Sequence, residues 1–114
     1  MRTFKGAHEI DCTQVIAGPF ATYQLALMGV DVVKIEQPGI GDQGRQMYPL
    51  DDGFEAAKYF AIYLCANAGK WSITLDLKHP NAKEVFRRMV KNADVVVENF
   101  KAGSMDCLGY GWDH

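Results

Sequence analysis

Short runs of β-branched residues alternate with segments of helical periodicity along this chain. The clearest runs cover residues 30–35 and 94–97, and each follows a helix-like segment. Before the second run, apolar residues recur at i, i+3, i+4, i+7 and i+8, so they share one helix face opposite a charged one. These apolar positions are Ala82, Val85, Phe86, Met89 and Val90. The alternation favours βαβ units, in which helices cover a sheet of parallel strands.

Weaker patterns predict the remaining elements. A first strand is expected over residues 9–15, followed by a helix over 18–29. A helix over 54–66 is apolar nearly all round and should be covered by other protein. A strand over 72–77 alternates polar and apolar residues, which favours a position nearer a sheet edge, and a last helix begins near 102–108. The helix over 18–29 should bury Tyr23, Leu27 and Met28.

The order of these elements predicts the fold class. Strands and helices alternate from one end of the chain to the other, which is the pattern of an open, doubly wound α/β sheet with helices on both faces. The 114 residues suffice for one modest domain, residues 1–114, with no second domain. The sheet has no closing strand, so we expect a partner chain, a dimer or further sequence to complete it.

Composition excludes several classes of function. The chain is 48% hydrophobic and 23% charged, as is ordinary for a soluble globular protein. A formal net charge of -2 gives no electrostatic reason to bind nucleic acid, and no apolar run is long enough to cross a membrane. The amino terminus lacks the pattern of a secretory signal, so a cytoplasmic location is expected.

Cysteine and histidine are too scattered to predict a metal site. Cys12, Cys65 and Cys107 are odd in number and far apart, which indicates reduced thiols rather than a disulfide framework or a zinc site. Cys12 and Cys65 lie in apolar surroundings and are expected in the core. The histidines suggest neither a catalytic triad nor a metal cluster. No metal cofactor is therefore expected.

Polar and turn residues collect where the four predicted strands end. They occupy residues 16–19, 36–39, 76–80 and 98–101. In an open α/β sheet the carboxyl ends of the strands form the ligand crevice. The turn between a strand and a helix also exposes backbone N–H groups that can hold anionic or carbonyl oxygens. The sequence therefore predicts a ligand site at this edge.

Five motifs in register carry a family resemblance. They lie at residues 11–21, 29–36, 38–45, 67–78 and 93–100. Together they resemble the amino-terminal part of a family III CoA-transferase, the CaiB/BaiF type. This group includes formyl-CoA transferase, carnitine CoA-transferase and α-methylacyl-CoA racemase.

The resemblance implies a fold, a substrate and a mechanism. The fold would be a Rossmann-like large domain, incomplete in this chain and usually found in an interlocked homodimer. Coenzyme A, bound as acyl-CoA, would lie across the strand ends, and a carboxylic acid would be the second substrate. The family's nucleophilic aspartate, which forms anhydride and thioester intermediates, would lie beyond His114. The fragment alone would then carry no catalytic residue.

The resemblance also implies which residues contact CoA. They follow all four strands, and two of them, Lys78 and Lys101, are the candidates for neutralising phosphate. The full set is Ile16, Ala17, Gln37, Leu75, Asp76, Leu77, Lys78, Asn99, Phe100, Lys101 and Cys107. Gln37, Trp71 and Cys107 stand where many members carry arginine, which predicts weaker phosphate binding. Ile16 replaces a glutamine of formyl-CoA transferases, which argues against formyl or oxalyl transfer.

Two other functions and several structural roles compete with this interpretation. Gly18 and Glu36 imitate a dinucleotide-binding unit of an oxidoreductase, in which the acidic residue holds a ribose, but the glycine fingerprint of that unit is absent. The chain could also be an assembly fragment without activity. Asp76 could order a strand end, Asn99 could cap a helix, and Arg45 lies in a long segment that is either a mobile loop near the ligand or disordered.

Overall fold

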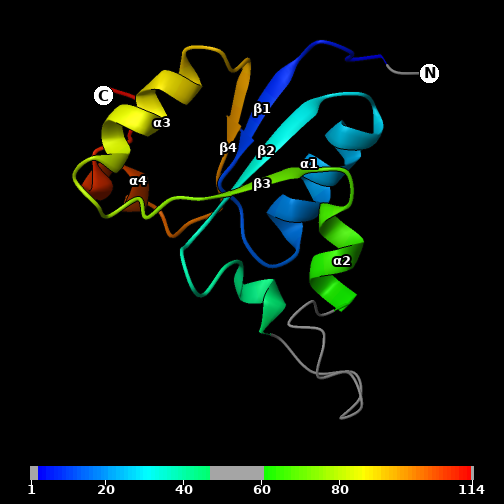
Figure 1. Cartoon of the computed structure of the whole chain (residues 1–114), viewed down its shortest axis with the longest axis horizontal. Coiled ribbons are helices and arrows are strands. Elements are labelled where there is room, and N and C mark those ends of the chain that lie inside the picture. Colours follow the sequence, from blue (N-terminus) through cyan, green and yellow to red (C-terminus); the bar gives the residue numbers. More distant parts are fainter. Residues whose placement is uncertain (1–2, 47–60, 114) are drawn as a thin grey trace.

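The computed structural model describes residues 3–46 and 61–113 of the chain. Within these residues strands and helices alternate, as Figure 1 shows. The strands are β1 (His8–Asp11), β2 (Asp31–Glu36), β3 (Trp71–Thr74) and β4 (Val95–Val97). The helices are α1 (Ala17–Leu27), the 3₁₀ helix η1 (Gln43–Arg45), α2 (Ala61–Asn67), α3 (Ala82–Val90) and α4 (Ser104–Leu108).

The four strands form one parallel sheet in the order β3-β2-β1-β4. Helices α1 and α2 lie on one side of the sheet and α3 and α4 on the other (Figure 1). This arrangement confirms the predicted α/β class with helices on both faces. Strand β3 occupies an edge, as its alternating pattern indicated. The carboxyl ends of β1 and β4, the two strands that bracket the candidate crevice, lie side by side.

An apolar core fills the face of the sheet that α3 and α4 cover. Ile10, Cys12 and Ile35 from the sheet pack against Phe86 of α3, and all four are buried. The ring of Phe86 meets Tyr110 edge to face at a centroid distance of 4.8 Å. Because the predicted helical face of residues 82–90 points here, Ala82 and Phe86 are buried as expected. Hydrophobic burial on this face holds the sheet to its helices.

The opposite face of the sheet carries buried charges. Alternate residues of β1, Glu9 and Asp11, and of β2, Lys34 and Glu36, are all at most 5% exposed. Side chains of a strand alternate between the two faces, so these four point away from the apolar core and toward α1 and α2. The layer between this face and the two helices is therefore polar.

Strand β1 is shorter than the predicted 9–15, because the side chain of its last residue turns the chain. The Asp11 carboxylate accepts hydrogen bonds from the backbone N–H and the hydroxyl of Thr13. The Cys12 N–H still donates to the carbonyl of Val97 at 2.8 Å, so pairing with β4 continues for one residue before the chain bends away. This local side-chain to backbone bonding starts the turn into α1.

Several residues expected in the core are exposed. On α1 the buried side chains are Pro19 and Thr22, whereas Leu27 is 58% exposed and Met28, which follows the helix, is 37% exposed, because the inner side of α1 meets a polar layer. Cys65 is exposed as well, although Cys12 is buried as predicted. Val85 and Val90 are also exposed, since α3 covers the sheet with Ala82 and Phe86.

The predicted helix over 54–66 falls partly outside the described residues, and its described part is α2. There Tyr63 and Ala66 are buried while Leu64 is 54% exposed. Among the helices of residues 3–46 and 61–113, none has the length and apolar character that a membrane span requires.

Glu9 is expected to destabilise the fold as it ionises. Burial, and next to it the negative charge of Asp11, raise the pKa of Glu9 from its ordinary 4.5 to about 7. The folded protein therefore binds this proton more tightly than the unfolded chain, and stability falls as pH rises from 4.5 to 7. Glu9→Gln should raise the free energy of unfolding by about 1 to 3 kcal/mol above pH 7, and hardly at all below pH 4.5.

Urea denaturation across this pH range measures the effect. Glu84→Gln is the matched control, since Glu84 is exposed on α3. An equal gain from Glu9→Gln at both ends of the pH range would contradict the assignment of the effect to ionisation.

Candidate functional site

A cavity of about 470 Å³ opens at the carboxyl edge of the sheet, between the ends of β1 and β4. Its walls come from the β1–α1 turn, from η1 and from the segment after β4. The lining residues are Gln14, Val15, Ile16, Ala17, Gln43, Asn99, Phe100 and Lys101. Five residues that the sequence singled out, from two segments about 80 positions apart, thus gather around one space. They are Ile16, Ala17, Asn99, Phe100 and Lys101.

The amino terminus of α1 forms part of this cavity. Ile16 precedes the helix, and no side chain caps this end. The first N–H groups of a helix have no partner within the helix, and they sit at the positive end of its dipole. Lys101 lines the same space. The cavity is therefore lined both by the first residues of a helix and by a lysine, a combination that suits a phosphate or a carbonyl oxygen.

Asn99 joins the two walls of the cavity. Its amide oxygen accepts a hydrogen bond from the Gln14 N–H at 2.8 Å, and its amide nitrogen donates to the Gln14 carbonyl at 2.9 Å. Because both polar atoms of the Asn99 side chain are bonded to Gln14, Asn99 shapes the cavity by holding Gln14 in place. It also does not cap α4, whose preceding residue is Gly103.

The other predicted site residues do not line this cavity. Gln37, Lys78 and Cys107 are exposed elsewhere on the surface. Asp76 is exposed too, and it orders the turn after β3 by accepting a hydrogen bond from the Lys78 N–H at 3.0 Å. The leucines on either side of it, Leu75 and Leu77, pack against the apolar core.

Lys70 binds the amino-terminal part of α1 through its ammonium group. Its ammonium lies 2.8 Å from the Asp11 carboxylate and 2.6 Å from the Thr22 hydroxyl, and it donates to the Pro19 carbonyl at 3.0 Å and to Asn67 at 2.8 Å. Burial pushes the pKa of Lys70 below its ordinary value, against the pull of Asp11. One lysine thus ties the end of β1, the first turn of α1 and α2 together.

Gly18 is required for this packing. A Cβ atom at residue 18 would collide with the side chain of Thr13. The Gly18-Pro19 pair is therefore explained by the close approach of α1 to the β1–α1 turn.

Lys34 holds the β1–α1 turn from the side of β2. Its ammonium donates to the Thr13 carbonyl at 2.8 Å and lies 2.8 Å from Asp42 and 3.9 Å from Asp11. Burial would raise the pKa of Asp11, but the charges of Lys34 and Lys70 and the hydrogen bonds from Lys70 and Thr13 outweigh it and hold that pKa below its ordinary value. The turn that lines the cavity rests on a set of paired, buried charges.

Glu36 is fully engaged inside the protein. Its carboxylate accepts two hydrogen bonds from Arg45, at 2.7 and 2.9 Å, and further ones from Tyr63 and Ser72 and from the Asp42 N–H. Burial raises its pKa, but these donors, Arg45 first, lower it to about 2. A carboxylate with this many internal partners does not hold a ribose. Glu36 therefore does not fill the role that the dinucleotide-binding interpretation gave it.

Arg45 contributes to the same cluster. Its guanidinium lies 3.6 Å from the centroid of the Tyr63 ring, as well as on Glu36. The described part of the long segment after β2, residues 37–46, is held by these contacts.

Sequence reasoning missed the residues beneath the cavity: Lys34, Asp42 and Lys70. In β2 charged and apolar residues alternate, which resembles a strand with one solvated face. A chemical signal could have identified them. Asp11 and Lys34 carry opposite charges at inward positions of two neighbouring strands, and the two residues are paired in register.

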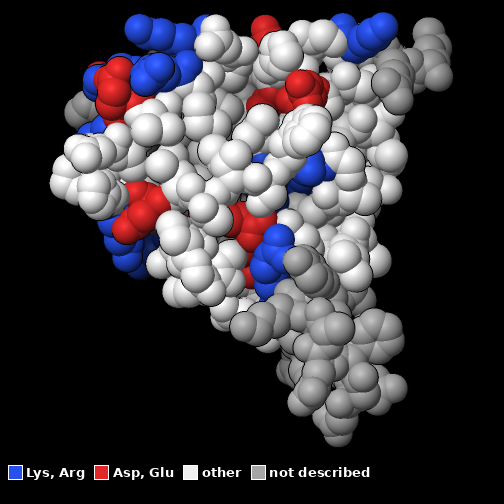
Figure 2. All heavy atoms as spheres, viewed as in Figure 1, with Lys and Arg blue, Asp and Glu red and all other residues white. Residues whose placement is uncertain are grey.

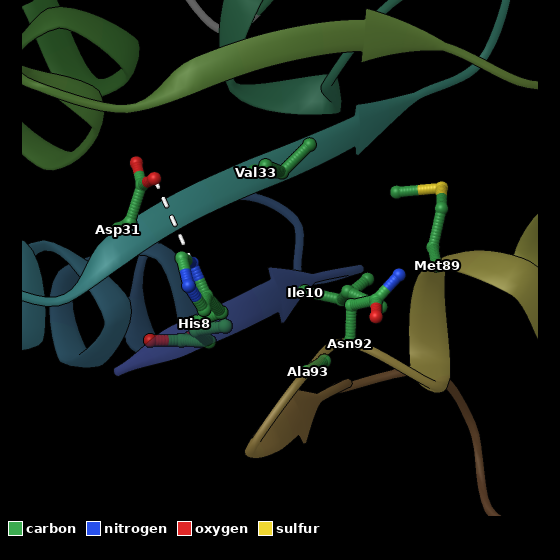
Figure 3. A pocket seen from close by; sticks show the side chains of 8 residues that line it. His8, Ile10, Asp31, Val33, Met89, Asn92 and Ala93 are labelled. Carbon is green, nitrogen blue, oxygen red and sulfur yellow. Dashed lines mark ion pairs between the residues drawn. The ribbon is translucent and has the colours of Figure 1, made fainter. Parts of the chain in front are cut away.

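A second cavity of about 530 Å³ lies at the opposite edge, where the strands begin (Figure 3). Its lining is largely apolar, with Ile10, Val33 and Met89 pointing into it. On its rim the His8 ring lies 3.7 Å from the Asp31 carboxylate. None of the predicted CoA-contact residues lines it, and its lining includes neither a helix amino terminus nor a lysine. The smaller cavity is the better candidate site.

Surface charges of opposite sign lie close to one another. On the face in Figure 2 acidic and basic side chains are interspersed. Within the described ranges, 3–46 and 61–113, no group of three or more potential ligands could hold a metal ion.

The chain and its fold match a known family. A sequence model of CoA-transferase family III matches residues 4–114, and the chain belongs to that family. It is 49% identical over 105 residues to the succinyl-CoA:mesaconate CoA-transferase of Haloarcula hispanica, which covers 91% of this chain and 26% of the relative. It is 41% identical over 115 residues to the formyl-CoA:oxalate CoA-transferase of Rhodopseudomonas palustris, with 98% and 25% covered.

Solved structures show the same fold. A CaiB/BaiF family protein from Brucella suis matches with a TM-score of 0.86 and 35% identity, over 99% of this chain and 30% of that one. A hypothetical protein from Mycobacterium tuberculosis matches with a TM-score of 0.85 and 37% identity, over 99% and 30%. This chain therefore spans about a quarter of the length of its curated relatives.

Lys70→Met is expected to destabilise the fold strongly. The substitution removes the nearer cation of the buried Asp11 carboxylate and leaves the Lys34 ammonium 3.9 Å away, and breaking a buried ion pair typically costs about 3 to 5 kcal/mol. Urea denaturation near neutral pH measures the loss. Lys91→Met, at the exposed end of α3, is the control and should change the free energy of unfolding by less than about 0.5 kcal/mol. A loss below about 1 kcal/mol for Lys70→Met would contradict the role given to this pair.

Proposed function

We propose that this chain is the CoA-binding amino-terminal portion of a CoA-transferase that moves CoA between carboxylic acids. The observation that carries the proposal is the meeting of the α1 amino terminus and Lys101 in one cavity. Membership of family III supplies the ligand that such a cavity would take. The relatives named above are CoA-transferases, and their shared chemistry requires that a CoA thioester be held in place.

The cavity offers CoA two kinds of contact. The N–H groups at Ile16 and Ala17 and the ammonium of Lys101 would hold phosphate or carbonyl oxygens. The side chains of Ile16 and Phe100 would cover the apolar parts of the molecule. In this proposal Gln37, Lys78 and the other predicted residues at the strand ends contact more distant parts of CoA, and Cys107 lies near it in place of an arginine.

The residues of this chain would bind and orient CoA, and they would not perform the transfer. In the proposed reaction an aspartate outside residues 1–114 attacks the acyl-CoA thioester, which releases the CoA thiolate and leaves an acyl anhydride. The thiolate then attacks the aspartyl carbonyl and releases the first carboxylate. The aspartyl thioester passes CoA to the second acid by the same two steps in reverse. A related acyl-CoA racemase would use the same CoA site.

We also propose the setting in which this happens. The complete enzyme would be a cytoplasmic homodimer, whose second chain or further sequence covers the side chains exposed here. Leu64 on α2 and Trp71 on β3 are such side chains, at 54% and 68% exposure.

Titration with CoA tests the function. When CoA is added to the 114-residue chain, the backbone amide signals of Ile16, Ala17 and Asn99 to Lys101 should shift saturably. The same signals should not shift when NAD is added. Lys101→Ala should weaken CoA binding about tenfold, because it removes a charge-assisted contact. Lys91→Ala removes an equivalent exposed lysine far from the cavity and should leave binding unchanged.

Other outcomes would point elsewhere. Shifts with NAD near Gly18 and Glu36 would favour the dinucleotide function. An absence of shifts with both ligands would contradict CoA binding by this chain and favour the assembly role.

A further inference from the structure

Val15 has an unusual backbone conformation within the cavity wall. Its φ of 73° is positive, and it is the one residue other than glycine with a positive φ in the described ranges, 3–46 and 61–113. A β-branched side chain rarely adopts this left-handed region, because its Cβ crowds the neighbouring carbonyl. Such a conformation persists where the surroundings hold it, and it often occurs where a ligand binds.

Asp42 supplies the contacts that hold Val15. One carboxylate oxygen accepts hydrogen bonds from the Val15 N–H at 2.9 Å and from the Gly44 N–H at 2.7 Å. The other oxygen lies 2.8 Å from the Lys34 ammonium. Asp42 is 2% exposed, so these interactions are shielded from water.

The same aspartate fixes the neighbouring wall of the cavity. Its bond to the Gly44 N–H caps η1, which begins at Gln43, and Gln43 lines the cavity beside Val15. The backbone N–H of Asp42 donates to Glu36 at 3.0 Å, which ties the loop to the end of β2. One side chain therefore sets the position of two separate walls.

We propose that Asp42 is a positioning residue, which holds Val15 in the left-handed conformation so that the N–H groups at Ile16 and Ala17 face the ligand before it arrives. The ligand part of this inference rests on the proposed function, namely an oxygen-rich ligand such as CoA. The structural part concerns the turn alone. A preformed turn binds more tightly because its ordering is complete in the free protein.

The geometry makes a specific demand on residue 15. Without Asp42, a valine should leave the left-handed region and distort the turn. A glycine accepts positive φ without steric cost, so Val15→Gly should keep the turn in shape even when Asp42 is replaced. A residue that only stabilised the fold would not be rescued in this way.

Amide hydrogen exchange and CoA titration of four variants of the 114-residue chain test the inference. Asp42→Ala should speed exchange of the Val15 and Gly44 amides about tenfold more than any general change at the amides of β1 and β2, and should weaken CoA binding about tenfold. Asp42→Asn keeps an oxygen acceptor and should leave these two amides protected. Adding Val15→Gly to Asp42→Ala should restore most of the CoA affinity, and Asp31→Ala, at the opposite edge, is the control.

The two readouts separate the possible failures. If the wild-type chain does not bind CoA, the proposed function fails, while exchange at Val15 and Gly44 still decides whether Asp42 holds the turn. Unchanged exchange at these amides in Asp42→Ala overturns the inference. So does a double variant that binds CoA no better than Asp42→Ala. If Asp42→Ala does not fold, two other results would overturn the inference. One is fast exchange of the Val15 amide in the wild-type chain, and the other is loss of protection of the Val15 and Gly44 amides in Asp42→Asn.

Discussion

The charged group formed by Asp11, Lys34 and Lys70 is the interaction on which the rest of the site depends. The side chains are at most 1% exposed, and the Asp11 carboxylate lies 2.8 Å from one ammonium and 3.9 Å from the other. A carboxylate is costly to bury alone, so its position requires both lysines to be in place. Because they also bind the carbonyls of Thr13 and Pro19, the same electrostatic constraint fixes the two ends of the β1–α1 turn.

The two faces of the sheet are held to their helices by different interactions. The face under α3 and α4 is apolar, and its burial drives the sheet and helices together. The face under α1 and α2 is built from ion pairs, which contribute less to stability than hydrophobic packing but allow few alternative arrangements. Directional bonds suit this face, since the position of the first turn of α1 determines where its N–H groups point.

Much of the fold could be predicted because strand and helix patterns are local. The β-branched run of residues 95–97 and the helical face of Phe86 identified β4 and α3, and the strand-end turns identified the cavity wall at Ile16 and Asn99. The buried charges could not be predicted in this way. Lys34 resembles a solvated residue until its distant partners are known, and Asp42 lies in a loop whose contacts are not encoded by periodicity. Cys65 was misplaced for the reverse reason, since its apolar neighbours share a helix with an exposed side.

The bond between Asn99 and Gln14 joins residues that are 85 positions apart, and this has a consequence for the order of folding. Strand β1 sits between β2 and β4, so its turn touches parts of the chain made early and late in synthesis. Contacts of such wide sequence separation form slowly, because a long loop must close first. On the ribosome, the β1–α1 turn would lack this bond until nearly 100 residues had emerged, so this wall of the cavity would be completed late.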